Sequence, residues 1–298
     1  MAFVYLLLAI VIDKILAEPK MFHPLVGFGF IASWLELKMN NHQIISGFLA
    51  WCLVVLPVVA LAYYSEKYLG EWVGIIWLYL AIGYQSLKQH GLAVHHALMK
   101  NDTRQASQQT QQIVSRNMEH ATQKQSIKAT TESILENSND AIFAPIFWFL
   151  VAGSAGVVLY RLVNTLDAMW GYKNNRFLKF GRWSARVDDV LNWLPARLTV
   201  VGFTLVSLDI KVLRAAKRHR WYSPNAGPVM AAGAYALKVR LGGGAFYHGQ
   251  YKYRRLLGGG QPVNNQTIVR AISLIEKNLL VILFITGVMF CLNMVVNY

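Results

Sequence analysis

The chain has 298 residues, of which 55% are hydrophobic and only 15% are charged. Soluble domains average roughly a quarter charged residues, so this composition argues against an ordinary soluble domain and favours a protein embedded in lipid. The formal net charge is +14, yet no nucleic-acid partner is expected, because the basic residues lie between hydrophobic runs as in cytoplasmic loops.

Four segments are predicted to cross a membrane fully, since a span needs about 20 mostly apolar residues. The first of them resembles a signal peptide, but it lacks a basic start and carries Asp13 and Lys14 where a cleavage site would lie, so we expect it to be retained. Cys52 and Cys291 lie inside apolar runs, which predicts neither a disulfide nor a metal site. The predicted full spans are 1–12, 44–64, 72–87 and 279–296.

Two further apolar segments, 141–163 and 193–208, are interrupted and can be either re-entrant or full crossings. The first contains Pro145 and Gly153, and the second contains Pro195 and Arg197, which allow a broken path. If both are re-entrant, all basic loops share the cytoplasmic face, as the charge bias of membrane proteins requires. We therefore favour re-entrant segments, with both termini outside.

The fold class predicted from these segments is an all-α polytopic integral membrane protein, forming one domain over residues 1–298. Residues 88–140 are rich in Gln and Ser and keep helical spacing of apolar residues, which predicts a cytoplasmic helical region. Residues 210–277 carry 12 Lys and Arg against one acid, Glu276, so they form a basic cytoplasmic segment. Such a segment is also suited to phosphorylated substrates.

An acidic stripe is predicted where Glu132, Glu136 and Asp140 recur at steps of four along one helix. Like charges at this spacing repel, and a divalent cation would offset that repulsion. Mg²⁺ typically takes one or two carboxylates together with substrate phosphates, which suits an ATP site. The alternative is a solvated helix face.

Polar residues are embedded among aromatic ones between positions 164 and 197. Ionisable groups near a span are costly, so they are usually paired or functional. Salt bridges of Asp188 with Arg186, or of Asp189 with Arg197, are the structural alternative to a functional site.

A rigid polar turn covers residues 223–228, where two prolines fix the backbone around Asn225 and Gly227. Two triple-glycine runs follow, at 242–244 and 258–260, with basic residues beside them. Consecutive backbone amides in such runs can bind anions, although glycine runs also serve as hinges. Neither run has the Gly-Lys-Ser/Thr ending of the common phosphate-binding loop.

Several long blocks together resemble the CbiB/CobD family of cobalamin-biosynthesis proteins, the adenosylcobinamide-phosphate synthases. The resemblance covers about nine-tenths of the chain, and this sequence is similar to a diverged member. The blocks are TESILENSNDAIFAPIFWF at 131–149, YRLVNTLDAMWGYKNNRFLKFGRWSARVDDVLNWLPARLT at 160–199, YSPNAG at 222–227 and VRLGG at 239–243.

The resemblance implies an ATP-dependent and Mg²⁺-dependent ligase of the bacterial inner membrane, with its site facing the cytoplasm. It would join (R)-1-amino-2-propanol, or its O-phosphate, to a propionate carboxyl of adenosylcobyric acid and give adenosylcobinamide or its phosphate. Other membrane-associated cobalamin-assembly enzymes are the implied protein partners.

The resemblance and the patterns above together assign candidate roles. The candidate catalytic residues are Glu132, Glu136, Asp140, Arg116, Arg186 and Arg197. The candidate magnesium ligands are Glu132, Glu136, Asp140, Asp188 and Asp189. The candidate substrate-binding residues are His23, Asn137, Asn164, Asp167, Tyr172, Asn192, Ser223, Asn225, Gly227, Arg240, Gly242 and Gly243.

Two departures from the family pattern keep a second hypothesis open. Asn117 stands where an Asp usually follows the Arg, and Met230 stands where Glu is usual. Losing two carboxylates is what a catalytically inactive relative would show, serving as a membrane scaffold or sensor.

Overall fold

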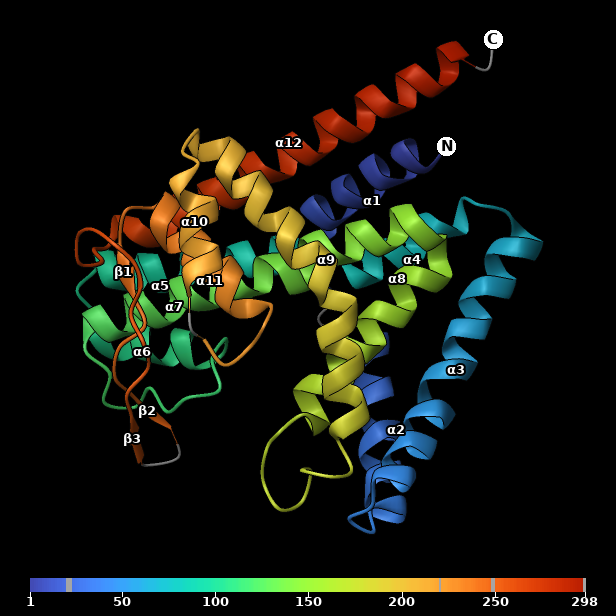
Figure 1. Ribbon diagram of the computed structural model, residues 1–298, viewed down its shortest axis with the longest axis horizontal. Coiled ribbons are helices and arrows are strands. Elements are labelled where there is room, and N and C mark those ends of the chain that lie inside the picture. The colour runs from blue at the N-terminus through green and yellow to red at the C-terminus, as the bar shows by residue number, and fades with distance from the viewer. Residues whose placement is uncertain (20–22, 220, 248–249, 297–298) are drawn as a thin grey trace. The chain divides into compact units, whose positions relative to one another are not determined.

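The structure is a computed structural model that describes residues 1–19, 23–219, 221–247 and 250–296. These residues are mostly helical and divide into two compact units. The first unit comprises residues 1–84 and 140–194, and the second comprises residues 85–139 and 195–298. Figure 1 labels the elements in chain order, coloured from blue at the N-terminus to red at the C-terminus.

The first unit is built from apolar helices around α8. Helices α3 and α4 pack on α8, α1 packs on α4, and α2 packs on α3. Helix α3 ends before Gly70, whose φ of 103° suits glycine at a helix terminus. The helices of this unit are α1 (Ala2–Leu16), α2 (Pro24–Met39), α3 (Ile44–Leu69), α4 (Val73–Ala81), α8 (Ala144–Trp170) and the first half of α9 (Arg182–Ser207).

The second unit is organised around α7, which contacts α6, α11 and α12. The basic helix α10 packs on α11, and β1 pairs with β4 beside α11. Its elements are α5 (Tyr84–Met99), α6 (Thr103–Gln111), α7 (Gln123–Ser138), α10 (Lys211–Arg218), α11 (Ala226–Ala236), β1 (Arg240–Leu241), β2 (Ala245–Tyr247), β3 (Gln250–Lys252), β4 (Leu257–Gly258) and α12 (Gln266–Val296), with the second half of α9.

Among the described residues, four helices are long and apolar enough to cross a membrane. They are α3, the continuous helical stretch Gln123–Trp170, α9 and α12. The predicted spans at 44–64 and 279–296 therefore lie in long apolar helices, as expected. The two ambiguous segments, 141–163 and 193–208, also lie in helices of sufficient length.

The predicted span over residues 72–87 is wrong as a single helix. Helix α4 covers only nine residues and ends at Ala81, and a short break precedes α5. The N–H of Gly83 in that break donates to the carbonyl of Ala141, so the interruption is a hydrogen-bonded feature. Helix α1 has 15 residues and is likewise shorter than a typical span.

Three local features refine the all-α prediction. Four strands of two or three residues form two antiparallel pairs between residues 240 and 258. Asp140 lies in a π-helical turn, Asn139–Phe143, so the regular step of four does not continue to it. The break expected near Gly153 is present, because Ala152 and Gly153 have non-helical backbone angles.

Candidate functional site

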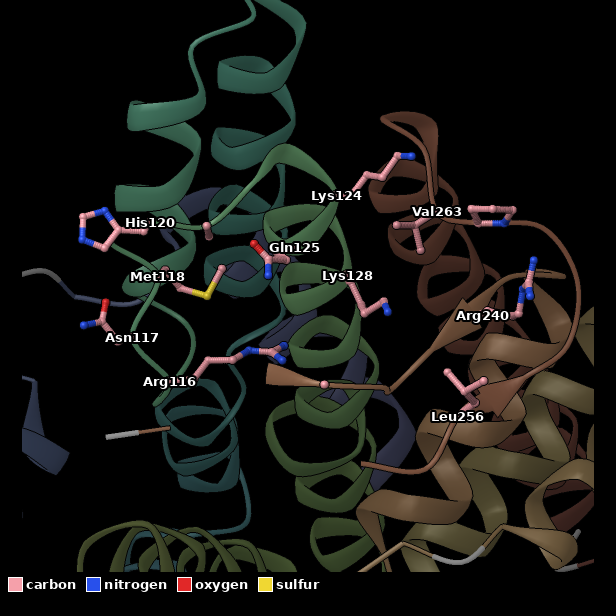
Figure 2. A pocket seen from close by; sticks show the side chains of 13 residues that line it. Arg116, Asn117, Met118, His120, Lys124, Gln125, Lys128, Arg240, Leu256 and Val263 are labelled. Carbon is pink, nitrogen blue, oxygen red and sulfur yellow. The ribbon is translucent and has the colours of Figure 1, made fainter. Parts of the chain in front are cut away.

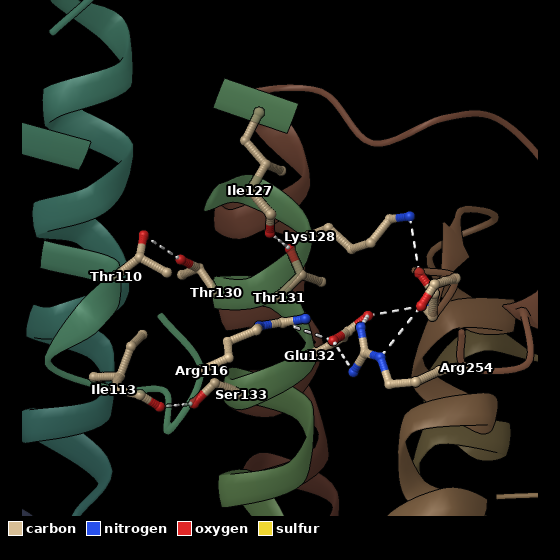
Figure 3. A network of polar contacts seen from close by, with 12 residues as sticks. Thr110, Ile113, Arg116, Ile127, Lys128, Thr130, Thr131, Glu132, Ser133 and Arg254 are labelled. Atoms are coloured by element: carbon tan, nitrogen blue, oxygen red, sulfur yellow. Dashed lines mark hydrogen bonds and ion pairs between the residues drawn. The ribbon is translucent and has the colours of Figure 1, made fainter. Parts of the chain in front are cut away.

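A buried ion-pair network surrounds Glu132 on α7, as Figure 3 shows. Its carboxylate lies 2.8 Å from Arg116 Nη2 and 2.9 Å from Arg254 Nη1. The backbone N–H of Gly242 donates a third bond, at 2.7 Å. All three side chains are nearly inaccessible to solvent, so two arginines supply the positive charge opposite one carboxylate in a medium of low polarity.

Local sequence explains how Arg116 reaches Glu132. Thr122 and Gln125 form a capping box, which starts α7 immediately after the connecting segment from α6. In that segment, Gln111 donates to the carbonyl of Arg116 at 3.0 Å. Ser133, one residue beyond Glu132, donates to the carbonyl of Ile113 at 2.7 Å. The segment is thereby held against the face of α7 that carries Glu132.

Glycines bring the third group, the loop after β1, to the carboxylate. Gly242 and Gly243 have φ angles of 76° and 79°, in the left-handed region that favours glycine. A side chain at Gly242 would overlap the backbone carbonyl of Arg255. Lys128 donates to the carbonyl of Gly242 at 2.9 Å. The glycine run does bind an anionic group, and that group is the protein's own Glu132.

A basic cavity of about 610 Å³ opens beside this network, within the second unit. Figure 2 shows the side chains that line it, with cationic groups from the segment before α7, from α7 itself and from β1. The volume lies within the range of ordinary ligand sites. The cations lining it are Arg116, Lys124, Lys128 and Arg240, and the apolar side chains include Met118, Leu256, Pro262 and Val263.

A smaller cavity of about 280 Å³ shares Arg116 with the basic cavity. Glu136 and Asn137 line it together with Glu132 and Arg254. Arg116 thus borders both a space rich in cations and a space that contains a second carboxylate. The walls of the first cavity are complementary to an anion, and Glu136 is the carboxylate in the second that is not ion-paired with Arg116 or Arg254.

The polar turn at 223–228 is held by Arg197 in the same unit. Arg197 Nη1 donates to the Asn225 side chain at 2.6 Å, and Nη2 donates to the carbonyl of Pro224 at 3.1 Å. Ser223 Oγ accepts the N–H groups of Asn225 and Ala226 at the start of α11. A side chain at Gly227 would overlap His219. Arg197 is therefore a positioning residue for the turn in this structure.

A second polar cluster lies in the first unit, around the buried carboxylate of Asp188 on α9. Asn192 donates to both of its oxygens at 3.1 Å, and Asn164 of α8 donates to one at 3.2 Å. Tyr160 in turn donates to the Asn192 side chain at 3.0 Å. Amide donors therefore hold Asp188, and the alternative of a salt bridge with Arg186 is not found among the described ion pairs.

The remaining predicted residues of the first unit are dispersed. Arg186 is exposed and makes no hydrogen bond or ion pair with any described residue. Tyr172 and Asp189 are also exposed, and Asp167 is half-buried near the end of α8. His23 is buried at the start of α2. Asp140 lies in the π-helical turn, where its carbonyl accepts a hydrogen bond from Tyr160.

The structure thus brings the predicted residues together in three groups. The group around the two cavities holds Arg116, Glu132, Glu136, Asn137, Arg240, Gly242 and Gly243; the turn holds Arg197, Ser223, Asn225 and Gly227; the cluster in the first unit holds Asn164, Asp188 and Asn192. In the described part of the chain, no three His, Cys, Asp or Glu side chains converge so as to hold a metal ion.

Sequence reasoning missed the contribution of Arg254. It was only one of the basic residues beside the glycine runs, and no spacing links it to Glu132, 122 positions earlier. Its guanidinium also lies over the Trp221 ring, 5.2 Å from the centroid, next to the turn that Arg197 holds. Arg254 follows Tyr253 and lies between the two glycine runs, but basic residues next to aromatic ones are common in proteins. This local pattern therefore could not have singled out Arg254 as a partner of Glu132.

The fold and these sites define a mostly helical protein that has four described helices long and apolar enough to span a membrane and a buried ion-paired site beside a basic cavity. Over residues 6–275 the chain matches the family described as CobD/Cbib protein, and it belongs to that family. The resemblance predicted from the sequence blocks is therefore confirmed.

Similar proteins share most of their length with this chain. Cobalamin biosynthesis protein CobD of Stutzerimonas stutzeri is 46% identical, with 93% of this chain and 95% of that protein covered. The protein of the same name from Chromobacterium violaceum is 43% identical over 92% of each chain. The one from Leptospira interrogans is 35% identical over 84% of this chain and 85% of that protein. No solved structure matches the chain.

Proposed function

We propose that this protein acts in cobalamin biosynthesis as an ATP-dependent amide-forming ligase. It would condense adenosylcobyric acid with aminopropanol or its O-phosphate, in the bacterial inner membrane and with the site facing the cytoplasm. Family membership and the names of the relatives support the pathway. The observation that carries the reaction class is the basic cavity adjoining a carboxylate-containing one through Arg116.

The chemistry requires a leaving group on the propionate carboxyl, and ATP supplies the phosphoryl group for it. A carboxylate oxygen would attack the γ-phosphorus of ATP, and the bond to ADP would break. The amine nitrogen would then attack the carbonyl carbon of the acyl phosphate, the C–O bond to phosphate would break, and the nitrogen would lose a proton as phosphate leaves. The propionate, ATP and the O-phosphate form of the amine are anionic, so cations must hold the reactants near one another. Lys124, Lys128 and Arg240 would bind phosphate oxygens, and Arg116 would neutralise the charge that develops between the cavities.

Glu136 is the carboxylate that this arrangement leaves for Mg²⁺ or for the amine. Glu132 is already bonded to two arginines and a backbone N–H, which assigns it a positioning role. Glu136 lines the smaller cavity beside Asn137, and one or two carboxylates with substrate phosphates are sufficient to bind Mg²⁺. The residues present therefore fit a magnesium nucleotide held partly by its own phosphates.

The decisive experiment measures product formation by the Glu136→Gln variant. Purified protein is incubated with adenosylcobyric acid, aminopropanol phosphate, ATP and Mg²⁺, and the condensed corrinoid is detected by mass spectrometry. We expect the variant to lose about a hundredfold or more in rate, as for loss of a charge-stabilising group. Glu71→Gln removes an exposed carboxylate from the first unit and should retain full activity.

Normal turnover by Glu136→Gln would remove Glu136 from the reaction. Absence of product from the wild-type chain with either amine would favour the second candidate function, a membrane scaffold or sensor. One observation supports that alternative: Met230, an apolar side chain, lines the smaller cavity where a carboxylate is usual in the family pattern.

A further inference from the structure

A second basic recess, which we call the α10 groove, lies in the second unit between α10, α11 and β4. Its volume is about 430 Å³. Helices α10 and α11 pack against each other beside it, and both are labelled in Figure 1. The α10 groove shares only Leu256 with the basic cavity of the proposed reaction, so it is a separate site.

Three cationic side chains of one helix line the α10 groove. Lys211, Arg214 and Arg218 are three and four residues apart, so α10 places them along one face. They span about 10 Å along the helix axis, since each residue adds about 1.5 Å. All three residues are exposed to solvent. Three positive charges are therefore concentrated on less than two and a half turns of helix.

The protein supplies no counter-charge for these three side chains. None of them makes a hydrogen bond or an ion pair with a described residue. No acidic residue is among the described residues that line the groove. Like charges on one helix face repel one another, and a bound anion would offset that repulsion.

The acids that the sequence places nearest to α10 are engaged elsewhere. Between residues 195 and 296 the sequence contains only Asp209 and Glu276. The Asp209 carboxylate accepts the backbone N–H of Lys211 at 2.9 Å. Glu276 pairs with Lys88 at 2.6 Å. The charge that lines the groove therefore stays positive.

The groove is a fixed feature of the packing, because glycine holds β4 against α11. Gly258 has a φ of 73°, and an added Cβ there would lie 2.5 Å from the carbonyl oxygen of Val239 and 2.6 Å from Cβ of Ala234. No other residue would let β4 approach α11 so closely. The second glycine run thus shapes a wall of the groove, to which Tyr235 adds a hydroxyl group.

The number of cations and their geometry select a phosphate group among anions. A guanidinium group can bind phosphate oxygens through two parallel N–H bonds, and two such groups lie one turn apart. A carboxylate or a phosphodiester carries a single negative charge, which is less than three cations can balance. A phosphate monoester carries nearly two at pH 7, and a diphosphate carries more.

We propose that the α10 groove binds a phosphate monoester or diphosphate group, held by Lys211, Arg214 and Arg218. A soluble organic phosphate and a lipid with a terminal phosphate offer the same chemistry. The lipid is included as a source because Leu208 and Ile210, directly before α10, are exposed apolar side chains. The proposal does not depend on the ligase reaction, since the groove lies apart from that cavity.

The test is chemical footprinting of the full chain in a non-ionic detergent. Phenylglyoxal modifies arginines, and peptide mass spectrometry reads each site separately. Saturating inorganic diphosphate should slow modification of Arg214 and Arg218 about tenfold relative to chloride at equal ionic strength. Arg104 is the internal control, because it is exposed in the same unit and lines neither cavity, so its rate should not change.

Two variants of α10 form a matched pair. Arg214→Gln removes a cation that lines the groove and should abolish the protection of Arg218. Lys217→Gln removes an exposed cation of the same helix that does not line the groove, and should leave the protection intact. Gel filtration establishes that both variants are folded. Full protection of Arg218 in Arg214→Gln would contradict the proposal.

The source of the phosphate is distinguished with phosphatidylcholine nanodiscs that contain or lack phosphatidic acid. Protection by phosphatidic acid but not by soluble diphosphate would assign the groove to a lipid headgroup, and protection by soluble diphosphate would assign it to a free phosphate. Protection by neither would overturn the proposal. Equal protection by sulfate or by a hexaglutamate peptide would show a general affinity for anions and would overturn the assignment to phosphate.

Discussion

At the scale of single residues, Glu132 is the most heavily bonded carboxylate in the second unit. Both of its oxygens are used, by Arg116, by Arg254 and by the N–H of Gly242. Each charge in such a buried cluster depends on the others, because an unpaired ion in a medium of low polarity is costly. The cluster joins the segment before α7 to the glycine loop after β1.

Replacing Glu132 by Gln should destabilise the protein by about 3–5 kcal/mol, since it leaves two buried arginines without their counter-charge. Unfolding of the purified protein by heat or denaturant measures this loss. Glu276→Gln is a suitable control, because Glu276 pairs with Lys88 at 2.6 Å on a partly exposed surface and should cost about 1 kcal/mol or less. Equal stability of the two variants would contradict the structural role of Glu132.

A second carboxylate, Glu36, gives a prediction about pH. It is bonded by Arg176 through Nε at 2.9 Å and Nη2 at 2.5 Å, and it also accepts from Asn40. The hydrogen bond from Arg176 lowers the pKa of Glu36 below its ordinary value, although burial acts in the opposite direction. A carboxylate with a lowered pKa stabilises the fold above its unfolded pKa and loses that effect as pH falls through the folded one.

We therefore expect wild-type protein to be more stable than Glu36→Gln at pH 7, and the difference to shrink as pH falls below about 4.3. Melting temperatures of both proteins, measured across this range, check the prediction. If the difference in melting temperature between the two proteins stays constant down to pH 3, the charge of the Glu36 carboxylate does not contribute to stability.

At the scale of elements, a hydrogen bond to a side chain of another helix explains how the break in α8 is stabilised. Gly153 has a φ of 57°, and the N–H of Ser154 that follows it donates to the carboxylate of Glu66 on α3 at 2.7 Å. A backbone N–H freed by a helix break must find another acceptor when it is away from water. Glu66 provides this acceptor and fixes the break against α3.

Glu66→Ala should remove the acceptor and cost about 1–3 kcal/mol, the usual penalty of a buried unsatisfied donor. Glu66→Gln keeps a side-chain oxygen in place and should lose less. Thermal stability of the two variants, measured side by side, distinguishes the roles of the acceptor and of the charge. If Glu66→Ala is as stable as wild type, another group must satisfy Ser154.

The elements differ in how far sequence could predict them. Long apolar runs such as 44–64 predicted helices, and the prolines and glycines of 141–163 allowed a broken path without deciding whether the segment crosses the membrane. The interruption between Ala81 and Tyr84 was missed, because the residues around it are as apolar as those of a continuous span. Strands of two residues, such as β1, depend on pairing with a distant partner and leave no local periodicity.

At the scale of the whole molecule, the sequence blocks correctly identified the family. The blocks also contain Glu132 and Glu136, which line the smaller cavity, and Arg240, which lines the basic one. Their contacts were beyond prediction, since they depend on which distant segments meet. The charge opposite Glu132, for example, comes from Arg116 sixteen residues before it and Arg254 far after it. The candidate roles in catalysis remain predictions for the assays above.

The distribution of Lys and Arg predicts which segments of the chain lie on the cytoplasmic side of the membrane. Residues 210–277 carry 12 Lys and Arg, so we expect them on the cytoplasmic side. The segment 173–186 carries five more, and the intervening α9 is the least apolar of the candidate spans, with a mean hydropathy of 1.3 against 2.2 to 2.7 for the others. A helix with that composition suits the membrane interface better than a full crossing, so both basic segments should face the cytoplasm.

Single cysteines at Lys173 and Lys217, in a chain whose Cys52 and Cys291 are replaced by serine, should therefore react with a membrane-impermeant maleimide only when the cytoplasmic side is accessible. Reaction of the two positions from opposite sides would show that α9 crosses the bilayer, and the charge bias would then be violated by one of its flanks.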